Sequence, residues 1–274
     1  MLVLLSSAKT LDFESPWDAP KPTQPEFVNE AHALVQTLRT YSASGLRTLL
    51  DVNPAIATLN RERYRRFSLP FTVRSAKPAL FAYRGDVYRQ LTVSRYRSEQ
   101  LAFAQRTLRI LSGLYGVLRP LDFIQPYRLE LSTKLRGPAW RDLYAFWSER
   151  VTRAIERDSL VDERQRSTPA KGSAGAGWII NLASQEYFRV LNTPRLRARI
   201  LTLTFKQDRH GTARMVPILA KRARGLMVNF ILTRRLADPR ALQTFRDGGY
   251  QYAPQHSSAT EWVFLRRASR ASPS

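Results

Sequence analysis

The 274-residue chain contains no cysteine and only three histidines. The lack of cysteine excludes disulfide bonds, thiolate nucleophiles and cysteine-ligated zinc or iron–sulfur sites. The histidines, His32, His210 and His256, show no metal-ligand spacing. We therefore expect no metal site and no cofactor, and a reaction that runs through a cysteine thiol is excluded.

Long apolar runs are missing as well. No run approaches the roughly 20 residues that a membrane helix needs. The opening Met1–Leu5 is apolar, but it has no basic leader and polar residues follow at once. That pattern is typical of a buried strand and not of a signal peptide. We expect a soluble, cytoplasmic protein without membrane contact.

Acidic residues are scarce: 22 Asp and Glu stand against 44 Lys and Arg, which gives a formal net charge of +22. Such a surplus favours a polyanionic partner, either nucleic acid or an anionic membrane face. The basic residues are overwhelmingly arginine, and codon bias in a high-GC genome would produce the same excess. Charge alone therefore leaves both explanations open.

The hydrophobic content of 43% suffices for a sizeable core. No linker divides the chain cleanly, so we predict one domain over residues 1–267. Residues 162–177 are rich in Ser, Gly and Ala and are interpreted as an inserted loop. The tail, 268–274, is expected to be disordered.

Near the N-terminus, residues 25–67 have the pattern of a helical hairpin. Apolar residues at helical spacing predict a helix from about Pro25 to Tyr41. Ser42 or Ser44 then caps a short helix, and Asn53–Pro54 begins another that runs to about Phe67. The amide groups and positive dipole end of that last helix suit a backbone phosphate. The DNA-contacting candidates are Asn53, Arg61 and Arg65, and the alternative is a purely structural helical pair.

The rest of the chain alternates strands with helices. Strands are predicted at residues 2–5, 78–83, 178–182, 199–206 and 261–267, and helices at residues 99–111, 140–160 and 218–236. A short turn at residues 208–211 joins two strands directly. We therefore predict an α/β fold with a mixed β-sheet flanked by helices.

Residues 111–130, LSGLYGVLRPLDFIQPYRLE, are the stretch around which the chain is organised. Two glycines and two prolines predict an irregular, closely packed loop. Polar groups must satisfy such a backbone, and Arg119, Asp122, Arg128 and Glu130 are the candidates.

This stretch closely resembles the signature of the YaaA family of bacterial peroxide stress resistance proteins. Further ordered matches are SSAKTLD at residues 6–12, RGDVY at 84–88, DLYAFW at 142–147, INLAS with EY at 180–187 and KRARGLM at 221–227. The chain departs from the family at Ser7, which replaces the usual proline, and at the inserted loop. The resemblance implies a cytosolic protein of oxidative stress that binds DNA through a helix-hairpin-helix element, with no settled enzymatic activity.

Charged and polar residues from these distant segments are predicted to line one cleft. Asn181, Ser184 and Glu186 stand at a strand-to-helix junction, where ligands collect in α/β sheets. The cleft candidates are Lys9, Asp12, Asp86, Arg119, Arg128, Glu130, Asn181, Ser184, Glu186, Lys221 and Arg224.

Two functions compete on these residues. One is DNA binding through phosphate contacts, without sequence specificity. The other is an enzyme acting on a phosphate-bearing or nucleobase substrate, with Glu130 or Glu186 as acid/base and Lys9, Arg119 and Arg128 holding an anion. No protein partner is inferable.

Overall fold

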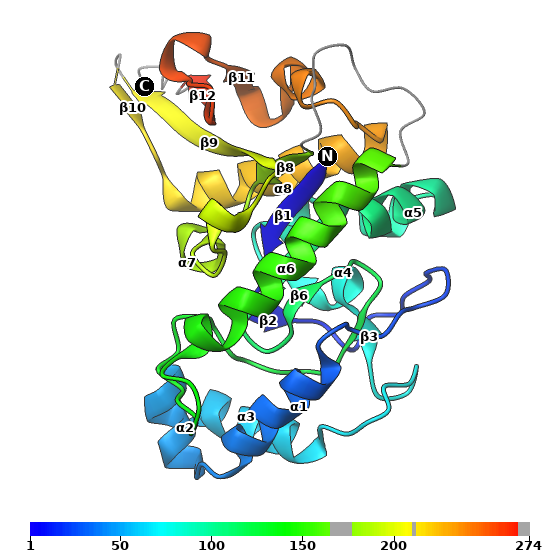
Figure 1. The fold of residues 1–274 in the computed structure, drawn as a ribbon, viewed down its shortest axis with the longest axis vertical. Coiled ribbons are helices and arrows are strands. Elements are labelled where there is room, and N and C mark those ends of the chain that lie inside the picture. The colour runs from blue at the N-terminus through cyan, green and yellow to red at the C-terminus, as the bar shows by residue number, and fades with distance from the viewer. Residues whose placement is uncertain (165–176, 210–211, 268–274) are drawn as a thin grey trace, which may run out of the picture.

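The computed structural model describes residues 1–164, 177–209 and 212–267. The main sheet of these residues has eight strands in the order β11-β12-β9-β8-β1-β5-β6, with β10 paired to β9 (Figure 1). Two further sheets pair β2 with β4 and β3 with β7. The strands are β1 (Leu2–Ser6), β2 (Thr10–Leu11), β3 (Lys77–Pro78), β4 (Tyr83–Arg84), β5 (Leu108–Ser112), β6 (Gly116–Leu118), β7 (Phe123–Ile124), β8 (Trp178–Asn181), β9 (Arg199–Arg209), β10 (Thr212–Arg214), β11 (Tyr250–Tyr252) and β12 (Glu261–Arg267).

The centre of the main sheet is parallel. Strands β5, β1, β8, β9 and β12 run in one direction, while β6, β10 and β11 are antiparallel to their neighbours. The side chains of Leu2–Leu5 are at most 1% exposed, because β1 is a central strand of a sheet that helices cover on both faces. A strand buried on both faces has an uninterrupted apolar sequence, which explains the opening of the chain. The predicted mixed sheet with flanking helices is confirmed.

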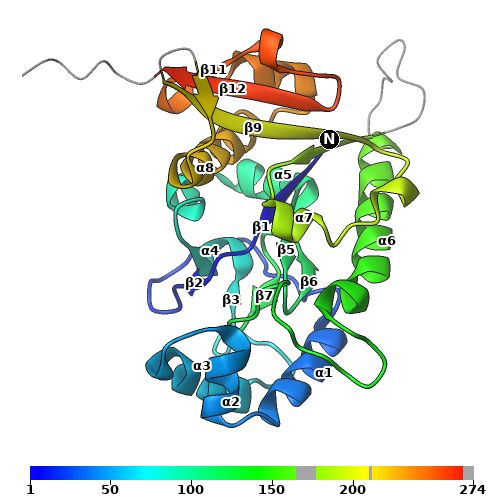
Figure 2. The same ribbon diagram turned by 90° about the vertical axis from the view of Figure 1, so that its left-hand side faces the viewer.

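Helices cover both faces of this sheet. Figure 2 shows α6 and α8 on opposite sides of β1, whereas α1, α2 and α3 gather at the end of the molecule far from β11 and β12. The helices are α1 (Val28–Arg39), α2 (Ala43–Leu50), α3 (Pro54–Arg66), α4 (Ala79–Ala82), α5 (Ser98–Thr107), α6 (Leu143–Arg164), α7 (Gln185–Phe188) and α8 (Pro217–Arg234).

The N-terminal helical segment follows its capping residues. The Ser42 hydroxyl accepts a hydrogen bond from the Gly45 amide at 3.1 Å, and the Asn53 side chain accepts one from the Ile56 amide at 2.9 Å. Asp51 between the two helices adopts a left-handed conformation, with φ 49°. Local chemistry thus fixes the start of α2 and of α3.

Two predicted elements are wrong. Residues 78–83 form no continuous strand: Ala79–Ala82 is the helical turn α4, whose Ala79 and Leu80 amides donate to the carbonyls of Asp122 and Pro120. The helix predicted to Leu111 ends at Thr107, because Leu108–Ser112 pairs with β1 as β5. Both segments are completely buried, and complete burial removes the periodicity that separates helix from strand.

Residues 111–130 are closely packed, as predicted, but they are less irregular than predicted, since β6 and β7 lie within them. A Cβ at Gly113 would lie 2.3 Å from the Leu129 carbonyl oxygen, so only glycine allows this approach. The Trp147 indole donates a hydrogen bond to the Gly113 carbonyl at 2.9 Å. Helix α6 is thereby fixed against the segment.

Two sequence predictions fall mainly outside the described residues. Of the inserted loop predicted at 162–177, residues 162–164 are the end of α6 and residues 165–176 lie outside the description. The predicted tail, 268–274, also lies outside it.

Candidate functional site

A pocket lies beyond the carboxyl ends of β1 and β8, and we call it the strand-end pocket. Its volume is ≈ 390 Å³, and its walls include residues 5–10 at the end of β1 and residues 182–187 after β8. In the strand order, β1 is followed by β5 on one side and β8 by β9 on the other. The loops that leave these two neighbouring strands therefore diverge, and such a divergence is the usual ligand site of open α/β sheets.

Six of the predicted cleft residues line this pocket. They come from the loop after β1, the loop after β4, the start of α7 and the first turns of α8, and they are Lys9, Asp86, Ser184, Glu186, Lys221 and Arg224.

Glu130 adjoins the strand-end pocket through Lys9. The Lys9 Nζ lies 2.6 Å from Glu130 Oε2, and Arg128 Nη2 lies 3.2 Å from Glu130 Oε1. The carboxylate is 17% exposed and the lysine side chain 60%, so the pair extends from the interior to the pocket wall. The Nε of Arg128 is buried and has no partner among the described residues. One acid thus holds two cations at the pocket's edge.

Glu186 occupies the first turn of α7. Its Oε1 accepts hydrogen bonds from the Ser132 hydroxyl at 2.8 Å and from the Ser132 amide at 3.3 Å. No partner of the second carboxylate oxygen is present in the described part of the chain, so that oxygen remains available to a ligand. The Ser184 amide donates to the Ser6 hydroxyl at 2.9 Å, which ties this loop to the end of β1.

Helix α8 reaches the pocket because Gly225 has no side chain. A Cβ at this position would lie 2.1 Å from the Val87 carbonyl oxygen. Only glycine lets the helix touch the loop of residues 84–88. The cations of the KRARGLM motif at 221–227 have different positions: Lys221 and Arg224 line the pocket, whereas Arg222 lies 4.0 Å from Asp86.

A second, larger cavity lies beside the first, and we call it the arginine pocket. Its volume is ≈ 1030 Å³. Thr10 and Arg84 line both pockets, so the two are neighbours. Its cationic lining residues are Arg63, Arg66, Arg74, Lys77, Arg84 and Arg89, and its carboxylates are Asp12, Glu14 and Glu62.

Asp12 belongs to the arginine pocket and not to the strand-end pocket. Its carboxylate accepts hydrogen bonds from the Ser15 amide at 2.9 Å and from Arg84 at 2.7 Å, and Lys77 lies 3.8 Å away. The Ser15 amide, followed by the Arg84 and Lys77 charges, lowers the pKa of Asp12 far below its usual value. Asp12 is therefore a carboxylate that holds Arg84 and Lys77 in place in the wall of the arginine pocket.

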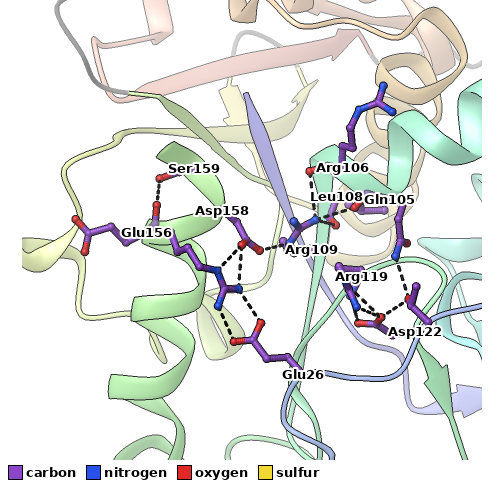
Figure 3. A network of polar contacts seen from close by, with 12 residues as sticks. Glu26, Gln105, Arg106, Leu108, Arg109, Arg119, Asp122, Glu156, Asp158 and Ser159 are labelled. Carbon is purple, nitrogen blue, oxygen red and sulfur yellow. Dashed lines mark hydrogen bonds and ion pairs between the residues drawn. The ribbon is translucent and has the colours of Figure 1, made fainter. Parts of the chain in front are cut away.

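Arg119 lies in neither pocket. It forms an ion pair with Asp122 at 3.0 Å, and the Arg119 amide also donates to that carboxylate at 2.7 Å. Figure 3 shows this pair near a second network, in which Arg109 binds Asp158. Both arginines neutralise acids in a packed region, and burial raises the pKa of Asp122. Arg119 is thus part of the structural polar network of the organising stretch.

Asn181 is 6% exposed and caps the loop after β8. Its Oδ1 accepts a hydrogen bond from the Ala183 amide at 3.0 Å, and its Nδ2 donates to the Thr202 hydroxyl at 3.3 Å. The side chain lies at the predicted strand-to-helix junction, but its oxygen and its nitrogen both form hydrogen bonds within the protein.

The three DNA-contacting candidates lie on or before α3. The oxygen of Asn53 already accepts from Ile56, and Arg65 pairs with Glu62 at 3.0 Å. Arg61 is exposed and lines neither pocket.

Several residues that line the strand-end pocket or the arginine pocket were not among the site residues predicted from the sequence. Arg84 lies in both pockets, and the RGDVY motif contained the signal for it. Tyr88 and Tyr187 form aromatic walls of the strand-end pocket, and burial raises the pKa of both phenols. No pattern in the sequence distinguishes Arg66, Arg74 and Arg89 from the other arginines, because each comes from a separate segment.

Within residues 1–164, 177–209 and 212–267, no helix is both long and apolar enough to cross a bilayer. The same ranges contain no cluster of three His, Cys, Asp or Glu side chains that could bind a metal ion.

Comparison with known proteins agrees with the sequence motifs. A family model described as peroxide stress protein YaaA matches residues 1–256. The chain is 42% identical over 268 residues to a UPF0246 protein of Ralstonia nicotianae, covering 98% of this chain and 100% of the relative. It is 43% identical over 268 residues to a UPF0246 protein of Magnetococcus marinus, again covering 98% and 100%. The chain therefore belongs to the peroxide stress protein YaaA family.

Proposed function

We propose that this protein acts in the peroxide stress response by binding DNA through phosphate contacts in the arginine pocket. The supporting observation is a group of arginines without ion-pair partners among the described residues: Arg63, Arg66, Arg74 and Arg89 line one open pocket. The net charge of +22 adds a general attraction for polyanions. Phosphate contacts of this kind position a duplex without reading its sequence.

The phosphate contacts proposed for the arginine pocket involve other arginines of α3 than those expected from the sequence. The sequence suggested Arg61 and Arg65, but Arg65 is engaged by Glu62, and neither lines the pocket. Arg63 and Arg66 come from the same helix and do line it. In this arrangement the helical hairpin contacts DNA through side chains along one side of α3. Asn53 acts as the N-cap of that helix.

The test compares pairs of arginine substitutions that remove equal charge. Arg66→Ala with Arg74→Ala removes two exposed, unpaired cations of the pocket, and Arg95→Ala with Arg106→Ala removes two exposed cations outside both pockets. Binding of a labelled duplex is followed by fluorescence anisotropy over a range of salt concentrations. We expect the pocket pair to lower the slope of log K against log salt by about 1–2 units, and the control pair to change it much less.

Equal weakening by the two pairs would contradict the proposal, because it would mean that the charge acts diffusely. A third pair, Arg61→Ala with Arg65→Ala, examines the exposed side of α3. The proposal predicts that this pair resembles the control. A loss equal to that of the pocket pair would place the contacts on the whole helix.

A second candidate is an enzyme acting on a phosphate-bearing or nucleobase substrate in the strand-end pocket. The observation that favours it is the convergence of four predicted residues: Glu130 joins Lys9 to Arg128, and Lys9 and Glu186 line one pocket. Acids beside fixed cations at diverging strand ends suit proton transfer on an anionic substrate. Phosphate binding alone needs no carboxylate.

A further inference from the structure

Two cations of the strand-end pocket have no acidic partner in the described part of the chain. Lys221 and Arg224 come from the first turns of α8 and line the pocket, and neither makes an ion pair within the described residues. Burial lowers the pKa of the Arg224 guanidinium, and no charge compensates for it. A partly buried cation without a partner costs stability. Its presence points to a negative group that the pocket takes up.

The carboxylates that line or adjoin the same pocket have other partners among the described residues, apart from one oxygen of Glu186. Asp86 lies beside Arg222, which extends from α8 outside the pocket, and Glu186 accepts two hydrogen bonds from Ser132. Glu130, at the edge, is held by Lys9 and Arg128. Arg224 is thus left for a ligand.

The backbone fixes Arg224 in this place. Gly225 brings α8 within contact of the Val87 carbonyl, so the neighbouring arginine is carried by a helix that packs directly against the pocket wall. Binding residues held on a packed helix lose little conformational freedom when a ligand arrives.

The remaining walls set the class of ligand. A volume of ≈ 390 Å³ lies within the range of small-molecule sites and is too small for a duplex. The lining also includes the hydroxyl groups of Ser6, Ser7, Thr10 and Ser184 and the rings of Tyr88 and Tyr187. Hydroxyls and a free Glu186 oxygen can bind the polar edges of a sugar or base, and the aromatic rings can contact its faces.

We infer that the strand-end pocket binds a phosphate monoester of about mononucleotide size, with the phosphate on Lys221 and Arg224 and the free Glu186 oxygen accepting a hydrogen bond from the remainder. The inference rests on the second candidate function, since it names the ligand class of that pocket. The same chemistry could come from a free nucleotide or from the 5′-phosphate end of a DNA strand.

The experiment measures binding of the four ribonucleoside 5′-monophosphates, inorganic phosphate and adenosine to the full chain by calorimetry. At least one monophosphate should bind at millimolar concentration or below, at least tenfold more tightly than adenosine. Arg224→Gln and Lys221→Gln should each weaken binding at least tenfold. The matched control is Arg234→Gln, which removes the same charge from the exposed C-terminal end of the same helix, outside the pocket, and should change binding less than twofold.

The melting temperature of the Arg224→Gln variant shows whether a loss of binding is caused by misfolding. Arg224→Gln removes a partly buried charge that has no ion-pair partner among the described residues, so the melting temperature of the ligand-free variant should equal or exceed that of the parent. Absence of binding by every monophosphate, equal binding of adenosine, or equal losses in the Arg234 and Arg224 variants would overturn the inference.

Further measurements distinguish a free nucleotide from a DNA 5′ end as the source of the phosphate. They also distinguish the monoester site from the proposed DNA binding by the arginine pocket. Tighter binding of a 5′-phosphorylated dinucleotide than of any mononucleotide would assign the phosphate to a DNA end, and the reverse would assign it to a free nucleotide; either result supports the monoester site. A bound monophosphate that is recovered unchanged from the same samples would count against the enzyme and for the binding site. Loss of duplex binding in the arginine-pocket pair is independent of all these outcomes.

Discussion

Glu130 shows how much of the site individual residues could reveal in advance. Its position in the organising stretch marked it as a polar group that must satisfy a packed backbone, and it does bind Arg128 two residues away. Its contact with Lys9, 121 residues earlier in the chain, depends on the placement of β1 beside β5. Spacing in the sequence contains no information about that contact.

Asp12 carries a prediction about pH. Its pKa is lowered in the folded protein, first by the Ser15 amide and then by Arg84 and Lys77. A lowered folded pKa adds stability that is complete above the ordinary aspartate pKa of about 3.9 and declines as the pH falls toward the folded value. Asp12→Asn should therefore destabilise the protein at pH 6, and the difference from the parent should narrow by pH 3.

Urea unfolding at the two pH values measures this difference. Asp238→Asn is a suitable control, because that side chain caps a surface turn and is 62% exposed. A difference between Asp12→Asn and the parent that stays constant from pH 6 to pH 3 would show that the carboxylate charge contributes nothing.

At the scale of elements, the sequence predicted best where local chemistry decides. Asn53 and Pro54 placed the start of α3 correctly, and the apolar spacing of residues 27–41 predicted α1. The failures, α4 and β5, are short and buried on all sides. Their conformation is set by the strands and loops around them, which a pattern of apolar residues does not specify.

The contact of α8 with the loop of residues 84–88 gives a prediction at this scale. Gly225→Ala places a methyl group 2.1 Å from the Val87 carbonyl oxygen, and a backbone atom cannot yield as a flexible side chain does. We expect destabilisation of about 1–3 kcal/mol by urea unfolding. Both the helix and the wall of the strand-end pocket should be displaced.

Gly45→Ala in α2 is the matched control. A Cβ there lies 3.3 Å from the Tyr41 ring and 3.4 Å from the Ser42 hydroxyl, and alanine favours a helix by about 1 kcal/mol over glycine. This variant should be no less stable than the parent by more than about 0.5 kcal/mol. Similar losses in both variants would mean that the close approach of α8 is unimportant.

For the whole molecule, the sequence predicted a shared site but not its division. Motifs scattered over the chain suggested one cleft, and the fold brings six of the residues to the strand-end pocket. Asp12 lies in the adjoining arginine pocket, whereas Arg119 and Asn181 are bound within packed segments. Burial and ion pairing decided these outcomes, and both depend on the tertiary structure.

The arginine pocket is the surface that we propose to bind DNA. Hydrogen–deuterium exchange of the full chain, with and without a saturating short duplex, tests this proposal most directly. We predict slower exchange in peptides covering residues 58–66, 73–77 and 84–89, which contain lining residues of that pocket, and no change at residues 239–256, which include β11. Slower exchange elsewhere with those three segments unchanged would contradict the account.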